Sequence, residues 1–208
     1  NAHISLAKLE ANCKRNFLLV TQNIDNLHER AGSKKILHMH GSLEKIYCMY
    51  CKHSEIFNFE LSSKYVCKNC KNVGMVRIDV VWFGEQPKYL DKIYSFLENT
   101  EVFISIGTSN NVYPAAGFID FLLQTGKKII FYEFNIETTN KSSLFDKNFI
   151  GPASKTVPGF VDRIIERRNL RDDISKILSI LLNRNSEVNF KNNDESSENT
   201  TPFTKAAS

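Results

Sequence analysis

The sequence predicts an α/β protein with a parallel sheet and a separate small zinc-binding lobe. Short apolar runs typical of buried strands alternate with amphipathic stretches of helical period, which is the pattern of a right-handed parallel α/β sheet. Two Cys-x-x-Cys pairs, Cys48/Cys51 and Cys67/Cys70, interrupt this alternation. The chain has 208 residues, 42% of them hydrophobic, so it is long enough for one main domain with a small insert.

The order of strands and helices follows from the apolar periods and from the residues that end each run. In chain order we predict a helix at 3–15, a strand at 17–20, a helix at 26–31, an extended segment at 35–38, an apolar segment at 77–85, a helix at 88–98, a strand at 102–106, a helix at 114–124, a strand at 128–132, a turn at 151–154, and helices at 157–167 and 173–182. Gly32 is suited to cap the second helix, and Gly84 can take a positive φ where its run ends.

The spacing of the four paired cysteines predicts one structural zinc ion. Each Cys-x-x-Cys pair presents two sulfurs on one side of a tight turn, and two pairs complete the tetrahedron that Zn²⁺ prefers. Because the protein would fill all four positions, this metal serves structure and not catalysis. A redox pair and incidental thiols are the alternatives. The fifth cysteine, Cys13, is expected to be an ordinary buried thiol.

Charge and hydropathy narrow the classes of partner. The formal net charge of +4 is dispersed and shows no dense Lys/Arg stripe, so we expect no nucleic acid partner. No apolar run approaches the length of a membrane span, and the first residues resemble neither a signal peptide nor a transit peptide. We therefore expect no membrane association and a cytoplasmic location. A mitochondrial location is the alternative, because a chain that begins inside a helix and without methionine looks like part of a longer protein.

Polar residues stand where the predicted strands end, which is where open α/β sheets bind ligands. Residues 21–25 (Thr-Gln-Asn-Ile-Asp) follow the first strand, 38–41 (His-Met-His-Gly) close the next extended segment, and 107–109 (Gly-Thr-Ser) follow the strand at 102–106. The glycine and hydroxyls at 107–109, placed between a strand and a helix, suggest an anion-binding site. The alternative for all three motifs is structural, as helix caps or hydrogen-bonded turn residues.

Taken together, these motifs resemble the sirtuins, a family of NAD-dependent protein-lysine deacylases. The set is completed by the two cysteine pairs, residues 80–85 (Val-Val-Trp-Phe-Gly-Glu) and residues 151–154 (Gly-Pro-Ala-Ser), and the resemblance covers about residues 2–168. The residue sequences of these motifs are most similar to those of the bacterial and mitochondrial branch of the family, which removes succinyl and malonyl as well as acetyl groups. The resemblance implies a Rossmann-like domain and a zinc lobe, with NAD and the acylated lysine side chain of a protein in the cleft between them.

The resemblance also assigns roles to individual residues. His40 matches the general base, which deprotonates a ribose hydroxyl after the acyl oxygen has attacked the ribose carbon and nicotinamide has left, on the way to O-acyl-ADP-ribose. The other implied contacts are Gln22, Asn23, Ile24 and Asp25 for nicotinamide and its ribose, Gly107, Thr108 and Ser109 for the phosphates, Asn135, Ile136 and Glu137 for the adenosine ribose, Ala153 for the adenine, and Val81, Phe83, Gly84 and Glu85 for the substrate lysine and peptide. Core packing is the alternative for Val81 and Phe83.

Two features of the family do not occur in this sequence. One is the first strand with its Gly-Ala-Gly-type loop, which cradles the NAD phosphates, and the other is the tyrosine and arginine of the acidic-acyl branch. We therefore expect a Rossmann-like sheet without its first strand and Gly-rich loop. The predicted domains are a Rossmann-like segment at 1–44, a zinc module at 45–76, a second Rossmann-like segment at 77–184 and a disordered tail at 185–208. A catalytically inactive sirtuin-like fragment or a zinc-stabilised binding module is the alternative function, and the oligomeric state is not predicted.

Overall fold

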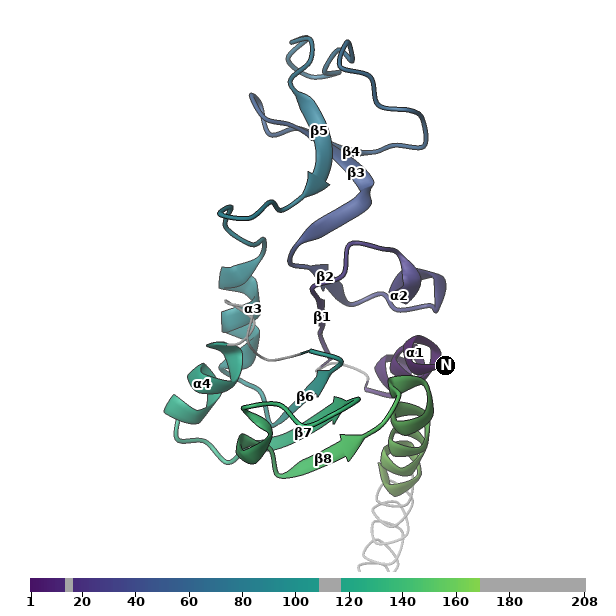
Figure 1. The fold of residues 1–208 in the computed structure, drawn as a ribbon, viewed down its shortest axis with the longest axis vertical. Helices are drawn as coiled ribbons and strands as arrows, with labels where there is room; N and C mark the ends of the chain where they lie inside the picture. Colours follow the sequence, from purple (N-terminus) through teal and green to yellow (C-terminus); the bar gives the residue numbers. More distant parts are fainter. Residues whose placement is uncertain (14–16, 109–116, 169–208) are drawn as a thin grey trace, which may run out of the picture. The chain divides into compact units, whose positions relative to one another are not determined.

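The computed structural model describes residues 1–13, 17–108 and 117–168 (Figure 1). The chain divides into two units, 1–162 and 163–208, and the elements below belong to the first. They are α1 (Ala2–Asn12), β1 (Leu19–Thr21), α2 (Leu27–Arg30), β2 (Ile36–His38), β3 (Gly41–Cys48), β4 (Ser54–Ile56), β5 (Val76–Val80), α3 (Leu90–Leu97), β6 (Val102–Ile106), α4 (Gly117–Gln124), β7 (Ile130–Asn135), the 3₁₀ turn η1 (Ser142–Leu144) and β8 (Lys147–Ile150). The predicted helix at 173–182 and the predicted tail at 185–208 lie outside the described residues.

The described strands confirm the parallel α/β class and separate it from the cysteine-bearing region. Strand β1 pairs with β2 in parallel, and β6, β7 and β8 form a second parallel sheet in that order. Strands β4, β3 and β5 form a distinct antiparallel sheet. In the parallel parts the ends of β1, β2, β6 and β7 carry Thr21, His38, Ile106 and Asn135, so the predicted polar motifs do follow strand ends.

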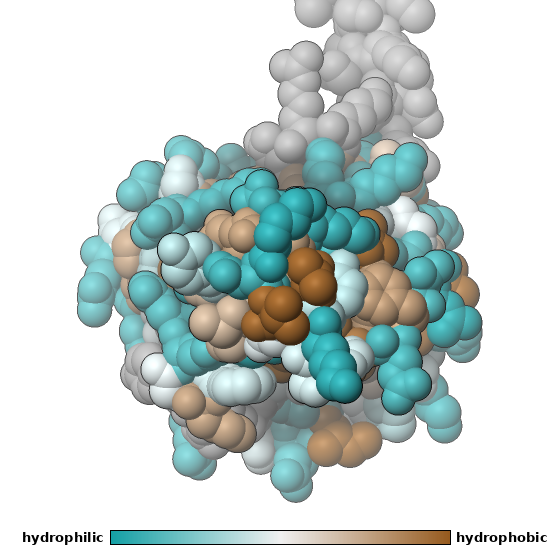
Figure 2. Space-filling model, turned by 90° about the horizontal axis from the view of Figure 1, so that it is seen from above, coloured by the Kyte–Doolittle hydropathy of each residue, from teal (hydrophilic) through white to brown (hydrophobic). Residues whose placement is uncertain are grey.

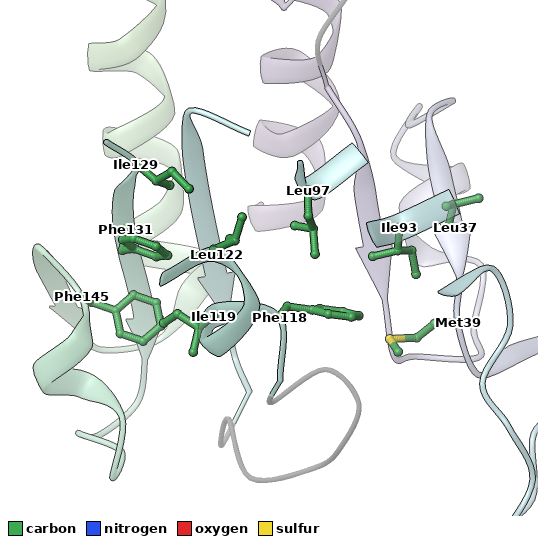
Figure 3. Packing of buried hydrophobic residues seen from close by; sticks show 10 residues of the cluster. All are labelled: Leu37, Met39, Ile93, Leu97, Phe118, Ile119, Leu122, Ile129, Phe131 and Phe145. Carbon is green, nitrogen blue, oxygen red and sulfur yellow. The ribbon is translucent and has the colours of Figure 1, made fainter. Parts of the chain in front are cut away.

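The main hydrophobic core fixes the position of the β2 end. Ten buried side chains form this core, drawn in Figure 3: Leu37, Met39, Ile93, Leu97, Phe118, Ile119, Leu122, Ile129, Phe131 and Phe145. Met39 is fully buried, and its main chain is held on both sides, because its amide donates to Thr21 and its carbonyl accepts from the Lys88 amide. Burying a side chain of this size contributes about 1.5–3 kcal/mol. Met39 therefore anchors the strand end that carries His38 and His40.

Helix α2 ends as its sequence predicts, at a glycine in the left-handed region. Gly32 has φ +102°, and the Ser33 amide reaches back to the His28 carbonyl while the Gly32 amide bonds to the Glu29 carbonyl. This pair of bonds is a Schellman C-cap, which satisfies the last carbonyls of a helix. Among the described helices, none is long and apolar enough to cross a bilayer.

Several elements differ from the sequence-based predictions or were not predicted. The apolar segment at 77–85, to which we assigned no strand, contains most of β5, which ends at Val80, and the turn that follows it. Strand β8 was not predicted, since its sequence Lys-Asn-Phe-Ile shows little apolar character and in the described sheet it pairs with β7 alone. The predicted turn at 151–154 already contains the start of a helix, for residues 153–168 are helical and the Lys155 and Thr156 amides bond to the Pro152 carbonyl.

The cysteine-bearing lobe, which includes this antiparallel sheet and the loops around it, leaves several apolar side chains in solvent. Ile56 is 74% exposed, Val73 is 60% exposed and Val66 is 48% exposed. Figure 2, which views the molecule from above relative to Figure 1, shows apolar residues within a mostly hydrophilic face. A lobe with so little buried apolar surface needs another source of stability, which a bound metal supplies.

Candidate functional site

The four paired cysteines lie together in an arrangement that fits a zinc ion. Their sulfur atoms all lie within 4.8 Å of one another, with 3.7 Å between Cys48 and Cys70 and 3.7 Å between Cys51 and Cys67. A tetrahedral site with Zn–S bonds of about 2.3 Å requires sulfur–sulfur distances of about 3.8 Å. A disulfide would bring two sulfurs to about 2.0 Å, so the distances exclude the redox-pair alternative in its oxidised form. The prediction of one structural, four-cysteine zinc site is supported.

His40 is oriented by the main chain of the first motif. Its Nδ1 atom lies 3.1 Å from the carbonyl oxygen of Gln22, and the ring is half-buried. Because a carbonyl oxygen only accepts hydrogen bonds, Nδ1 carries the proton and the lone pair of the neutral ring is on Nε2. No described residue provides a hydrogen bond to Nε2. The ring therefore presents a proton acceptor, as a general base requires.

The motifs after β1, β6 and β7 converge through side-chain hydrogen bonds. The Gln22 amide Nε2 lies 3.5 Å from the Thr108 hydroxyl. The Asn135 amide Nδ2 donates to the Thr108 carbonyl at 2.7 Å, and the Ile136 amide donates to Asn135 Oδ1 at 3.0 Å. The structure thus brings three predicted cofactor contacts, together with His40, to one edge. Ser109, the last residue of the middle motif, lies outside the described residues.

The remaining residues of the first motif, at positions 23–25, also form hydrogen bonds within the fold. Asp25 Oδ1 accepts from the amide of Leu27, the first residue of α2, at 3.0 Å, while the N-cap residue Asn26 forms no side-chain capping bond. Asn23 presents its side chain to solvent, while its carbonyl accepts from His38 Nδ1 at 3.0 Å. The Ile24 carbonyl accepts from the Leu43 amide. Capping and ligand binding are compatible, because each group can accept more than one hydrogen bond.

The other residues assigned to the adenosine end lie at the start of two segments that follow strands. Ile136 is 63% exposed and Glu137 is also exposed, directly after β7. Ala153 is half-buried in the first turn of the helix at 153–168. The structure leaves these side chains accessible, and Ile136 joins the Gln22–Thr108–Asn135 group through its main-chain amide.

The segment after β5 forms a turn that exposes its aromatic residues. The Glu85 amide donates to the Trp82 carbonyl at 2.9 Å, and Gly84 takes φ +87°. The Glu85 carboxylate accepts from the Trp82 amide and from Arg77, and these two contacts hold the pKa of Glu85 below its ordinary value. Phe83 is fully exposed, so core packing is the wrong interpretation of this side chain. Exposed aromatic surface of this kind is typical of binding sites.

A glycine fixes how the segment that carries His40 meets this turn. Gly41 has φ +84°, and a Cβ atom at this position would lie 1.8 Å from the carbonyl oxygen of Asp79. Next to this close approach, the Val81 amide donates to the His40 carbonyl at 2.9 Å. The predicted general base and the predicted peptide-binding segment are therefore joined directly through the main chain.

Two charged residues beside this junction have no motif that singles them out. Asp79 is buried on β5 and forms an ion pair with Lys88, which precedes α3. Lys88 also donates its amide to the Met39 carbonyl, so it ties the turn to the core. No local sequence pattern indicates this ion pair, because nine residues and a turn separate the two partners.

Comparisons with known proteins agree with this geometry. The sequence pattern described as "Sir2 family" matches residues 1–114. An NAD-dependent protein deacylase of Bdellovibrio bacteriovorus is 48% identical over 165 residues, which are 79% of this chain and 68% of the relative. One from Salmonella typhimurium is 45% identical over 165 residues, which are 79% of this chain and 60% of the relative.

Solved structures give the same result for the fold. A structure described as a Sir2 homolog–NAD complex matches with a TM-score of 0.70 at 32% identity, over 80% of this chain and 64% of its own. A Sir2–p53 peptide–NAD⁺ structure matches with a TM-score of 0.63 at 28% identity, over 81% of this chain and 70% of its own. The chain thus spans between 60% and 70% of the length of these four proteins.

Proposed function

This chain belongs to the Sir2 family, and on that premise we propose that it removes acyl groups from protein lysines with NAD as co-substrate. The observation that carries the proposal is the hydrogen bond between His40 Nδ1 and the Gln22 carbonyl, because it leaves Nε2 as the proton acceptor. The proposal is also supported by the names of the two relatives, both of which are NAD-dependent protein deacylases. Acetyl is the proposed acyl group, with succinyl and malonyl as further groups on the resemblance of residues 80–85.

The residues at the converging strand ends fit NAD. Gly107 has φ +63° and open space where a Cβ would be, so a phosphate group can approach its backbone closely. The amides of Gln22 and Asn135 can exchange hydrogen bonds with a carboxamide and with ribose hydroxyls. When bound, NAD supplies the ribosyl carbon that takes up the acyl oxygen as nicotinamide leaves.

The chain's own residues supply the proton acceptor, the peptide-binding surface and the structural support. His40 takes a proton from a ribose hydroxyl at Nε2, and the Gln22 carbonyl then stabilises the charged ring through Nδ1–H. Val81, Gly84 and exposed Phe83 offer backbone and apolar surface for an extended peptide that carries the acylated lysine. The zinc site holds the lobe from which this segment emerges and takes no part in the chemistry.

A cytoplasmic location stays a prediction, as does the expectation of no nucleic acid or membrane partner. Five free cysteines, four of them grouped for zinc, are consistent with a reducing compartment.

The test is a calorimetric titration of the zinc-loaded chain with NAD, followed by an assay for nicotinamide release in the presence of an acetyl-lysine peptide. A dissociation constant in the micromolar range, about −8 kcal/mol, together with acyl-dependent nicotinamide release supports the proposal. A folded, zinc-loaded chain that binds no NAD would contradict it and favour the inactive, zinc-stabilised binding module.

A further inference from the structure

A pocket of 350 Å³ lies beside the segment proposed to bind the peptide. Its wall includes Val81 and Glu85 from that segment, Tyr47 from β3, Arg77 from β5, and the lysines Lys52 and Lys88. The pocket therefore lies between the antiparallel sheet and the segment Val81–Glu85, which is proposed to bind the acylated lysine.

Three positive groups surround one aromatic ring in this pocket. Lys52 Nζ lies 5.9 Å from the centre of the Tyr47 ring, Arg77 Cζ lies 4.7 Å from it and Lys88 Nζ lies 5.4 Å from it. The face of an aromatic ring attracts cations, so Tyr47 offsets part of the repulsion between them. The arrangement keeps positive charge concentrated at the pocket wall.

The carboxylates of the pocket form ion pairs with only two of these three positive side chains. Glu85 pairs with Arg77 at 2.5 Å, and Asp79 pairs with Lys88. No carboxylate of the described residues forms an ion pair with Lys52. The surrounding stretch is also basic, with six Lys/Arg and three Asp/Glu between residues 44 and 77. The pocket thus has one unmatched positive group and lies in a positive field.

We infer that this pocket takes the carboxylate of an Asp or Glu side chain close to the acylated lysine, with Lys52 as its ion-pair partner. The inference rests on the proposed function, because it places the substrate peptide along Val81–Glu85. Side chains two residues apart in an extended peptide lie on one face, about 6–7 Å from each other, so a flanking residue can reach a neighbouring pocket while the acylated lysine occupies its own site. The pocket makes this chain selective for acidic sequences around the modified lysine.

The test is fluorescence anisotropy with labelled acetyl-lysine peptides and the full zinc-loaded chain. Glu is placed in turn at each of the three positions on either side of the lysine, and each peptide is compared with its Gln counterpart. At one position we expect the Glu peptide to bind about three- to fivefold more tightly, which is the usual size for a partly exposed ion pair. The difference should shrink at high salt.

Variants of Lys52 and of a matched control lysine test whether Lys52 causes the preference for Glu-containing peptides. Lys52→Gln should remove the preference for Glu, and Lys52→Glu should reverse it in favour of a Lys-flanked peptide. Lys64→Gln, which removes an exposed lysine of the same lobe outside the pocket, should preserve the preference. Zinc content of each variant verifies that the lobe is folded.

The outcomes separate this inference from the proposed function. Acetyl-dependent binding with no difference between Glu and Gln at any position overturns the inference and leaves the proposed function in place. A Glu preference that persists in Lys52→Gln also overturns it. A Glu preference that depends on Lys52 supports the inference. If unacetylated peptides bind as tightly and show the same preference, the proposed function is contradicted and the inference about Lys52 stands.

Discussion

The Nδ1 atom of His40 lies 3.1 Å from the main-chain carbonyl oxygen of Gln22, so the main chain of one motif orients a side chain of the other. A main-chain acceptor does not change its protonation state, and it therefore selects the tautomer of the neutral ring. The consequence is a proton acceptor at Nε2 that depends on the path of residues 21–25 and not on a second ionisable side chain.

Replacing His40 should remove turnover and preserve the fold. His40→Ala is expected to lower the rate of nicotinamide release by about 10²–10⁴-fold, the usual contribution of a general base, with little change in melting temperature because the ring is only half-buried. Product formation and thermal unfolding are measured on the same preparation. Substantial residual turnover with an acetyl-lysine peptide would rule out His40 as the base.

Asn135 should matter for NAD and its neighbour Asn140 should not. Asn135→Ala removes the bond to the Thr108 carbonyl and the acceptor for the Ile136 amide, so we expect about tenfold weaker NAD binding, or about 1.4 kcal/mol. Asn140 is exposed on the same loop, and Asn140→Ala is the matched control. Calorimetry compares both with the unmodified chain, and equal affinities for the two variants would contradict the role of Asn135.

Loss of zinc should unfold the small lobe. Cys67 is 1% exposed within the four-sulfur cluster, so Cys67→Ser is expected to lower zinc content below one ion per chain and to abolish the ordered near-ultraviolet signal of the lobe. Cys13→Ser, which removes the thiol outside the cluster, should keep full zinc content. Metal analysis and circular dichroism provide the measurement. A Cys67→Ser protein with normal zinc and normal melting would show that the cluster is not a zinc site.

Two glycines with positive φ should respond very differently to alanine. Gly41→Ala places a methyl group against the Asp79 carbonyl, and we expect a loss of about 3 kcal/mol or more in the free energy of unfolding. Gly126 has φ +65° but open space around the Cβ position, so Gly126→Ala should cost only the conformational strain of about 1 kcal/mol. Urea denaturation tests both, and similar losses would mean that the approach of β3 to β5 is not as close as described.

His28 should make the protein less stable as the pH falls. Burial is the main cause that lowers the pKa of His28, and neighbouring His3 and His38 act in the same direction against Glu29 and Asp25. Because the unfolded chain takes up this proton first, the stability present above about pH 6.5 decreases as the pH drops below that value. Melting temperatures between pH 5 and pH 7.5 measure the effect. His28→Gln should flatten the profile, and an unchanged slope would assign the pH dependence to other groups.

Much of the local structure could be predicted because its signals are local. The spacing of Cys48, Cys51, Cys67 and Cys70 indicates four ligands whatever the rest of the chain does, and the structure places the four sulfurs together. Strand β6 was predicted at its observed bounds because a fully apolar run between turns has few alternatives. Strand β8 was missed because its pairing depends on β7 and not on its own composition.

The sequence by itself determined the parallel α/β class and the zinc ligands, since these rest on periodicity and on the spacing of neighbouring residues, and the resemblance of its motifs indicated the family. Only the tertiary structure decided that Gln22 reaches Thr108 across 86 residues and that Asn135 closes the same group. It also decided that Phe83 lies in solvent and that Lys52 lies in a pocket with Arg77. The physical reason is that such contacts depend on how separate segments pack, and packing is a property of the whole core that no local pattern contains.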